Sequence, residues 1–151
     1  MTEAVYLSLM RAALEQARAA EALGEIPIGA VVAVDGVIVG AGHNRNIVDR
    51  DPSAHAEIVA LREAARATSN HRLVGAVLVT TLEPCLMCCG AAVQARIGRL
   101  VHAADDPKAG ALDVLRHEMQ RGKVNHHIEL LQGPLGEEAG ELLRAFFRGR
   151  R

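Results

Sequence analysis

Three side chains in two short stretches of the sequence have the types and the spacing of metal ligands. His55 lies two residues before Glu57, and Cys85 and Cys88 form a Cys-x-x-Cys pair directly after Pro84. One imidazole and two thiolates suit zinc, and three protein ligands leave the fourth tetrahedral position for a water molecule. A carboxylate such as Glu57 beside that water can take up and return its proton. The residue types therefore predict a catalytic zinc site.

The segments around these residues predict that both ligand groups lie at the start of helices. Ser53 can cap a helix whose apolar residues recur through 58–65, which puts His55 in or next to its first turn. Pro84 stands where a second helix can begin, and residues 85–95 contain no helix breaker except one glycine. Unpaired amide groups and the helix dipole favour anionic ligands at such positions, so the thiolates are favoured before a metal binds.

The remaining apolar patterns predict an α/β sandwich with a mixed sheet. Asp35-Gly36 between two β-branched runs is a strong hairpin signal, and strands alternate with helices after it. The expected elements are helices at 6–23, 113–119 and 137–148 and strands at 30–34, 37–41, 76–81, 100–103 and 128–131. Because no repeat, linker or low-complexity stretch interrupts the chain, we expect a single domain over residues 1–151.

The composition limits the class of protein. Hydrophobic residues make up 50% of the chain but aromatic ones only 2%, so the core must be aliphatic. A formal charge of −1 gives no general attraction to nucleic acid, and any basic surface must be local. No apolar run reaches the length of a membrane span, and the first residues lack the pattern of a signal peptide. With only three cysteines, the chain fits a reducing compartment, and we expect a cytoplasmic location without a membrane partner.

Two less specific interpretations of the ligand residues stay open at this point. His55 can be a solvated histidine at a helix start, with the two cysteines of the pair as small buried residues. Alternatively the zinc is structural, which requires a fourth protein ligand such as Cys89 or another histidine. Cys89 follows Cys88 directly on a helix and is therefore expected to point away from the site and to pack in the core.

Together, His-x-Glu and Pro-Cys-x-x-Cys form the signature of zinc-dependent nucleobase deaminases. The flanking residues in 52–57, 81–88 and 96–99 resemble those of the bacterial tRNA-specific adenosine deaminases, within the cytidine-deaminase-like superfamily. The resemblance extends from the first helix to the arginine-rich C-terminus. It implies a three-layer α/β/α sandwich around a five-stranded mixed sheet, a homodimer, and one catalytic Zn²⁺ per subunit. The implied reaction is hydrolysis of the wobble adenosine of a tRNA anticodon stem-loop to inosine, with release of ammonia.

The same resemblance implies roles for residues outside the zinc site. Asn44 would hold the target nucleoside, while Asp106 and Lys108 would lie on the loop that lines the anticodon-binding groove. Asn125 would lie near the pocket, and Phe147, in the closing helix, near the bound strand. The metal ligands and Glu57 keep the roles that their residue types predict.

The sequence also departs from the family. Asp105 stands where an arginine is expected, Asn46 where a proline is usual, and Cys89 where a small residue is usual. The loop at 108–112 looks shortened and the one at 120–124 lengthened. These changes leave the chemistry untouched but bear on the grip on a polynucleotide, because an acid facing phosphate opposes binding.

Two alternative functions follow. A deaminase of a free nucleobase or nucleoside (guanine, cytosine or adenine) would use the same zinc site without a basic groove. A zinc-stabilised binding module would keep the ligands but would not need Glu57.

Overall fold

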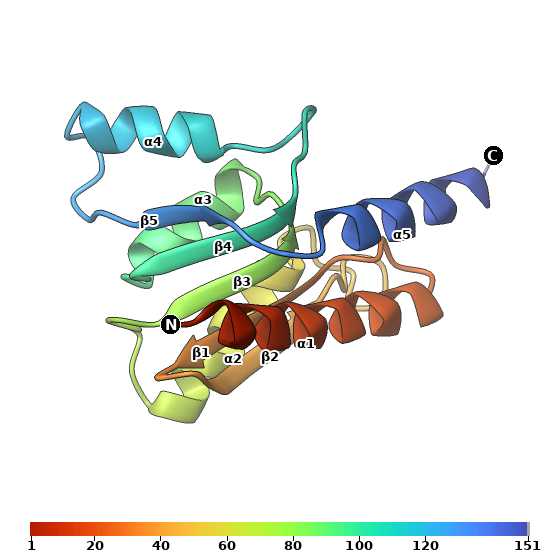
Figure 1. The fold of residues 1–151 in the computed structure, drawn as a ribbon, viewed down its shortest axis with the longest axis horizontal. Helices are drawn as coiled ribbons and strands as arrows, with labels where there is room; N and C mark the ends of the chain where they lie inside the picture. The colour runs from red at the N-terminus through yellow and green to blue at the C-terminus, as the bar shows by residue number, and fades with distance from the viewer. Residues whose placement is uncertain (151) are drawn as a thin grey trace.

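The structure is a computed structural model that describes residues 1–150. The chain has five helices and five strands: an N-terminal helix and a hairpin are followed by four helices that alternate with three strands (Figure 1). The helices are α1 (Glu3–Ala22), α2 (Ala56–Thr68), α3 (Leu86–Gln94), α4 (Leu112–Gln120) and α5 (Gly136–Arg148). The strands are β1 (Gly29–Val34), β2 (Val37–His43), β3 (Val77–Leu82), β4 (Arg99–Ala104) and β5 (Glu129–Gln132).

The strands form one five-stranded mixed sheet in the order β2-β1-β3-β4-β5. β1 runs antiparallel to β2 and β3, whereas β3, β4 and β5 run parallel to one another. The hairpin between β1 and β2 turns at Asp35 and Gly36, whose φ angles are 50° and 78°. Two left-handed residues match the twist of the flanking strands, which explains why Asp-Gly stands here.

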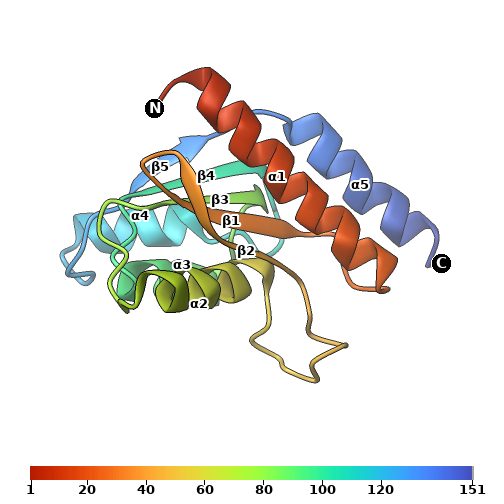
Figure 2. The same cartoon turned by 90° about the horizontal axis from the view of Figure 1, so that it is seen from below.

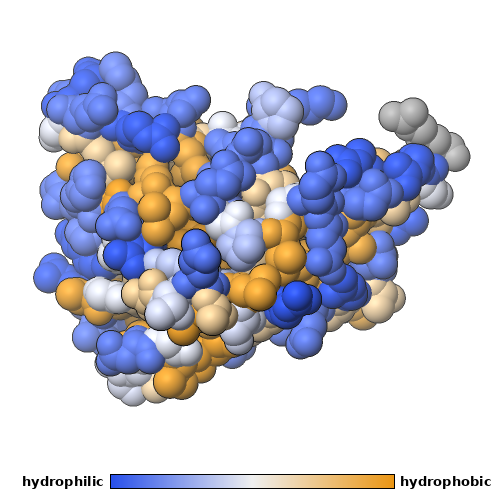
Figure 3. All heavy atoms as spheres, viewed as in Figure 1, coloured by the Kyte–Doolittle hydropathy of each residue, from blue (hydrophilic) through white to orange (hydrophobic). Residues whose placement is uncertain are grey.

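Helices cover both faces of the sheet, so the molecule has three layers. Figure 2 shows α1 and α5 side by side on one face and α2 and α3 on the other. α4 follows β4 and lies beside α3 (Figures 1 and 2). On the face seen in Figure 3, polar residues gather over α4 and α5, while apolar residues are exposed in the hollow between α4 and the sheet. This confirms the α/β sandwich with a mixed sheet that the apolar patterns predict and the three-layer α/β/α arrangement that the family resemblance implies.

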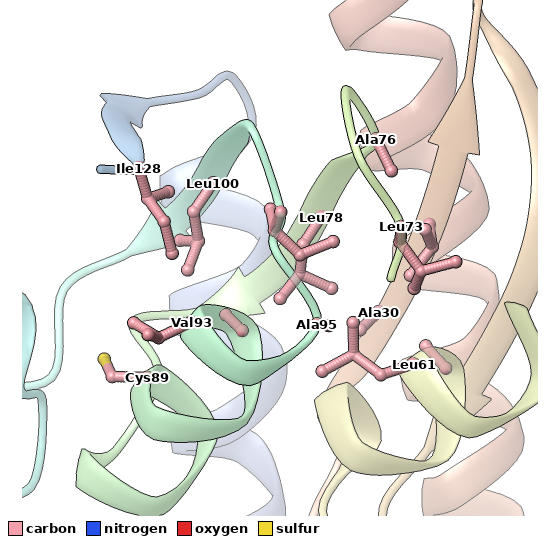
Figure 4. Packing of buried hydrophobic residues seen from close by; sticks show 14 of the residues in the cluster. Ala30, Leu61, Leu73, Ala76, Leu78, Cys89, Val93, Ala95, Leu100 and Ile128 are labelled. Atoms are coloured by element: carbon pink, nitrogen blue, oxygen red, sulfur yellow. The ribbon is translucent and has the colours of Figure 1, made fainter. Parts of the chain in front are cut away.

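The core consists of two aliphatic clusters, one on each face of the sheet. In the first, Leu78 and Leu100 of the central strands meet Leu61 of α2 and Val93 of α3 (Figure 4). In the second, Met10 and Leu14 of α1 pack on the other face of the sheet, against Val31, Val79 and Val101 of the strands. The central strands are apolar on both faces because both faces are covered.

Two glycines on β2 set the position of α2 and therefore of the residues at its start. A Cβ atom on Gly40 would lie 2.4 Å from the carbonyl oxygen of Ala60, and one on Gly42 would lie 2.7 Å from the Ala60 nitrogen. Both neighbours are helix backbone atoms that cannot move alone. The absence of a side chain at these positions lets α2 lie directly on the hairpin.

Most predicted elements are confirmed to within a few residues at their ends. α1 begins earlier than expected, because the Thr2 hydroxyl accepts a hydrogen bond from the Val5 N–H at 3.3 Å. The predicted cap of α2 is wrong. The N–H and the hydroxyl of Ser53 both donate to Asp51 Oδ1, at 2.8 and 2.7 Å, and the N-cap residue is His55. Within residues 1–150, no helix combines the length and the apolar character that a membrane span requires.

Candidate metal centre and active site

The side chains of His55, Cys85 and Cys88 converge on one point. The Nδ1 atom of His55 lies 3.5 Å from Cys85 Sγ and 3.6 Å from Cys88 Sγ. A tetrahedral ion with Zn–N bonds of about 2.1 Å and Zn–S bonds of about 2.3 Å would separate nitrogen from sulfur by roughly 3.6 Å. The donor types and their separations therefore fit zinc, with the imidazole binding through Nδ1.

Two helix starts bring these ligands together. His55 is the N-cap residue of α2 and Cys85 that of α3, and neither side chain is used for capping. Their carbonyl groups instead accept from the N–H groups of Val59 and Cys89, at 3.0 and 2.9 Å, so the helices are closed while the side chains stay free. The expectation that both ligand groups lie at helix starts is confirmed.

A distant side chain supplies the missing cap of α2. Oδ1 of Asn44, at the end of β2, accepts a hydrogen bond from the Ala56 N–H at 2.9 Å. Asn44 is 4% exposed, and its own N–H donates to the Ile28 carbonyl at 3.2 Å. Its carbonyl end is thus used by the protein, so its NH₂ end points elsewhere and is the group that can donate to a ligand.

Glu57 is buried beside the ligand group. It is 4% exposed, and burial raises its pKa to about 7, an effect partly offset by a backbone hydrogen bond and by the thiol of Cys88. Burial, together with the nearby charge of Glu57, also raises the pKa of the Cys88 thiol. A divalent ion bound by His55, Cys85 and Cys88 would stabilise the thiolate of Cys88 and the carboxylate of the neighbouring Glu57. Burial lowers the pKa of His55, which favours the neutral imidazole that a metal ligand must be.

Cys89 belongs to the core and not to the ligand group. It is 2% exposed, its sulfur lies 3.8 Å from the Pro84 carbonyl oxygen, and burial raises its pKa to about 12. Among residues 1–150, the group close enough to share an ion that contains cysteine consists of His55, Cys85 and Cys88, without Cys89. The prediction that Cys89 packs in the core is confirmed.

Asp106 and Lys108 lie together on the loop between β4 and α4. Oδ1 of Asp106 accepts from the N–H groups of Lys108 and Ala109, at 3.1 and 3.2 Å, so this carboxylate shapes the turn. The Lys108 side chain is exposed. The loop is joined to the metal-ligand segment, because the Ala111 N–H donates to the Pro84 carbonyl at 2.9 Å.

The structure does not bring Asn125 to the metal-ligand group within one chain. Oδ1 of Asn125 accepts from Arg96 Nη1 at 3.2 Å, and Arg96 follows the C-terminal end of α3 whereas Cys85 lies at its N-terminal end. Phe147 is exposed on α5, and its ring packs edge-on against Phe146 with 5.3 Å between the centroids.

Two of the departures from the family have a structural explanation. The side-chain amide of Asn46 donates to the carbonyl groups of Asp51 and Pro52, at 3.0 and 3.2 Å, and so closes the 46–52 loop that a proline would otherwise stiffen. Asp105 is paired with His102, whose Nε2 lies 2.8 Å from Asp105 Oδ1.

Two acids that hold loop backbones, the buried Glu25 and the half-buried Glu83, were missed by reasoning from the sequence. Glu25 accepts from the N–H groups of Ile47 and Val48, at 3.0 and 2.8 Å, and fixes the loop that follows Asn44. Glu83 accepts backbone hydrogen bonds from the loop after β4. The one signal for Glu83 was its place next to Pro84, directly before the cysteine pair.

The chain is similar to proteins of known activity. A profile of the MafB19-like deaminase family matches residues 6–151. Over 144 residues the chain is 50% identical to the tRNA-specific adenosine deaminase of Haemophilus influenzae. The aligned region covers 95% of this chain and 83% of that protein. A solved structure from work on A-to-I editing by tRNA:A34 deaminases at the wobble position superposes with a TM-score of 0.86 at 39% identity, covering 91% of this chain and 99% of that one. The guanine deaminase of Nitrosomonas europaea superposes with a TM-score of 0.76 at 30% identity, over 91% and 82% of the two chains.

These proteins are all deaminases, and the fold and the His/Cys/Cys group place this chain in the same class of enzymes. Within that class, the chain belongs to the tRNA-specific adenosine deaminase family. The resemblance seen in the sequence is thereby confirmed.

Proposed function

We propose that this enzyme hydrolyses the wobble adenosine of a tRNA anticodon to inosine and releases ammonia, using one Zn²⁺ per subunit. The observation that carries the chemistry is the buried carboxylate of Glu57 beside the convergent His55, Cys85 and Cys88. The substrate follows from the relatives, because the protein that is 50% identical acts on tRNA by its name.

The ion would be held by His55, Cys85 and Cys88. When bound, it would make a nearby water more acidic, lowering the pKa of that water from about 15.7 toward roughly 7. Glu57 accepts a proton from the attacking water as the water oxygen adds to C6 of the adenine ring. The same carboxyl group delivers this proton to the ring nitrogen next to C6. A second proton, from the new hydroxyl group, then passes through Glu57 to the amine. The bond between C6 and the amine nitrogen breaks, ammonia leaves, and a C6 carbonyl remains.

The burial of Glu57 suits this role. A general acid–base works best when its pKa lies near the working pH, and in the metal-free protein burial raises the pKa of Glu57 to about 7. A bound ion would favour the carboxylate, and burial opposes that effect, so the side chain can both take up and return a proton. Its burial also excludes bulk water, which would otherwise exchange the transferred proton.

Asn44 is proposed to hold the nucleoside. Its carbonyl end caps α2, so a substrate oxygen or ring nitrogen would meet the NH₂ end, next to the ligand-bearing helix. The target base must leave its stack before its C6 atom can come next to the Glu57 carboxylate. Unstacking a base requires less free energy in a single-stranded loop than in a duplex.

The outer contacts are proposals of the same kind. We assign Asp106 and Lys108 to the groove that takes the anticodon stem-loop, and Asn125 and Phe147 to its periphery. The exposure of Lys108 and of Phe147 supports these roles. The placement of Asn125 at the far end of α3 makes it the weakest contact of this set.

We further propose a single-domain, cytoplasmic homodimer. Leu86 on α3 and Val114 on α4 are 66% and 49% exposed, and the groove between these helices has an apolar lining. Large exposed apolar side chains on neighbouring helices are typical of an interface between subunits.

Deamination of a free base is the second candidate, because a guanine deaminase has a similar fold at 30% identity. Ammonia release from zinc-loaded protein, measured with tRNA, adenosine, guanine and cytosine side by side, separates the two. The proposed function predicts release from tRNA and at most slow release from the others. Fast release from guanine, with none from tRNA, would support the alternative.

A further inference from the structure

A single carboxylate holds both ends of the loop between β4 and α4. Oε1 of Glu83 accepts from the Asp106 N–H at 3.0 Å, and Oε2 accepts from the Leu112 N–H at 3.2 Å. The Glu83 N–H in turn donates to the Ala104 carbonyl at 2.8 Å. Since Glu83 lies two residues before Cys85, the shape of this loop is tied to the segment that carries the metal ligands.

A glycine lets the loop lie against this carboxylate. A Cβ atom on Gly110 would lie 2.3 Å from Cδ of Glu83 and 2.5 Å from the carbonyl oxygen of Asp106. The loop backbone thus passes directly over the side chain that holds it. Both oxygens of Glu83 are occupied by backbone N–H groups, which is the arrangement of an anchor.

A second side chain anchors the start of the loop. Nε2 of His102 lies 2.8 Å from Asp105 Oδ1, and the His102 side chain is 8% exposed whereas that of Asp105 is 69% exposed. Within residues 1–150, Nδ1 of His102 is buried without a hydrogen-bond partner, so Asp105 is the group that orients this ring. The pair links a buried ring on β4 to the first residue of the loop.

We infer that Glu83 and His102 are positioning residues that hold the 105–112 loop in its substrate-binding shape, and that Asp105 is an anchor point of this loop and not a substrate ligand. The acid at position 105 is then drawn toward His102, which reduces its repulsion of phosphate. The inference concerns the shape of the loop; it rests on the proposed function only for the activity measurement below.

The direct test is backbone amide hydrogen exchange over residues 104–113 of the zinc-loaded enzyme. Glu83→Gln keeps one acceptor oxygen but turns an NH₂ group toward the other backbone N–H. We expect exchange in this segment to become about tenfold faster or more, as for loss of a charge-assisted hydrogen bond. Glu118→Gln is the matched control, because Glu118 pairs with Arg121 on its own helix end.

The second anchor, the pair of His102 and Asp105, is tested with substitutions at the exposed Asp105 and at His102. Asp105→Ala and His102→Phe should both speed exchange at the start of the loop, whereas Asp105→Asn, which retains the acceptor oxygen, should restore protection. Asp105 is exposed, so its variants keep the test decisive even if Glu83→Gln fails to fold. Unchanged exchange in Asp105→Ala would overturn the role of the pair.

Steady-state kinetics provide a separate measurement, because a purely structural role of Asp105 would not change KM and kcat differently. With tRNA as substrate, Asp105→Ala should raise KM about threefold to tenfold with kcat within about twofold, and Asp105→Asn should restore KM. A lower kcat with unchanged KM would contradict the inference. If wild-type enzyme forms no inosine in tRNA, the proposed function fails, while the exchange experiment still decides the role of the anchors.

A metal titration tests the competing explanation. The ligand atoms of Glu83, His102 and Asp105 lie within 4.8 Å of one another, a distance at which they could also share an ion. Our inference predicts one equivalent of zinc per chain in wild type and in His102→Phe. A second equivalent in wild type that is lost in His102→Phe would assign the cluster to a metal and overturn the inference.

Discussion

His55 Nδ1 and Cys85 Sγ lie 3.5 Å apart although thirty residues separate them in the sequence. Each stands at the N-cap of a helix, and β3 runs between those two helices along the chain. The ligand group therefore depends on the packing of two helix starts at one end of the sheet. Its geometry follows from the sandwich and not from a local loop.

Replacement of single cysteines should separate ligands from core residues. We expect Cys85→Ser and Cys88→Ser to lose zinc and to melt at a lower temperature, because metal binding stabilises the folded state. Cys89→Ala should retain one zinc per chain, since Cys89 contacts the Pro84 carbonyl within the core. Metal analysis of the purified variants checks this. Zinc depletion in Cys89→Ala would refute the ligand assignment.

The zinc-free protein should become less stable as pH rises through the range set by Glu57. The pKa of Glu57 is raised from 4.5 to about 7 on folding, so the folded state keeps a proton that the unfolded chain releases in this range. This contribution to the free energy of unfolding is present below about pH 4.5 and is lost as pH rises through 7, with a magnitude of roughly 3 kcal/mol.

Glu57→Gln is the matched control for this pH dependence, because glutamine does not titrate. The lowered pKa of His55 acts in the opposite direction but is common to both proteins. Denaturant unfolding of zinc-free protein is measured at about pH 5 and pH 8. The free energy of unfolding should decrease more between these two pH values in wild type than in Glu57→Gln. Equal losses in the two proteins would mean that Glu57 is not protonated in the folded state.

A methyl group at Gly40 should disturb α2. Because its Cβ would lie 2.4 Å from a helix carbonyl oxygen, Gly40→Ala should reduce the free energy of unfolding by about 1–3 kcal/mol and weaken zinc binding at the start of α2. Gly90→Ala is the control: its Cβ would meet nothing within 4 Å, and alanine favours the helix by up to about 1 kcal/mol. Denaturant unfolding and metal titration compare the two variants.

Salt dependence should distinguish backbone contacts from nucleoside contacts. Each phosphate neutralised on a single strand contributes about −0.7 to the slope of log K against log salt, so Lys108→Ala should flatten this slope by about that amount. Asn44→Ala should lower turnover and leave the slope unchanged. Arg144 and Arg148 both pair with Glu141, so we expect only a small contribution from this part of α5. A slope that is the same in Lys108→Ala and wild type would exclude a phosphate contact at this lysine.

The elements and the group of His55, Cys85 and Cys88 were predictable because they depend on local patterns. Apolar periodicity sets the helices and strands, and the Cys-x-x-Cys spacing places two thiols on one turn. The cap of α2 was not predictable in this way. Ser53 is the natural local cap, but Asp51 binds it, and Asn44 from the end of β2 takes its place.

The anchors of the 105–112 loop were missed for a similar reason. Glu83 bonds to Asp106 and Leu112, more than twenty residues away, and only the parallel pairing of β3 and β4 brings them together. The pair of His102 and Asp105 is close in sequence, but its importance depends on the burial of the histidine. No spacing rule reveals which of several acids is held by a buried ring.

The central claim is tested most directly by mapping inosine in tRNA. Zinc-loaded enzyme is incubated with a tRNA whose anticodon begins with adenosine, and the modified position and the ammonia released are measured. The account predicts one inosine per tRNA, at the wobble position, with one ammonia for each. It also predicts a rate lower by about 10²–10⁴ in Glu57→Gln, which keeps its zinc. Release of ammonia from guanine or cytosine with no inosine in tRNA, or near-normal turnover in Glu57→Gln, would contradict it.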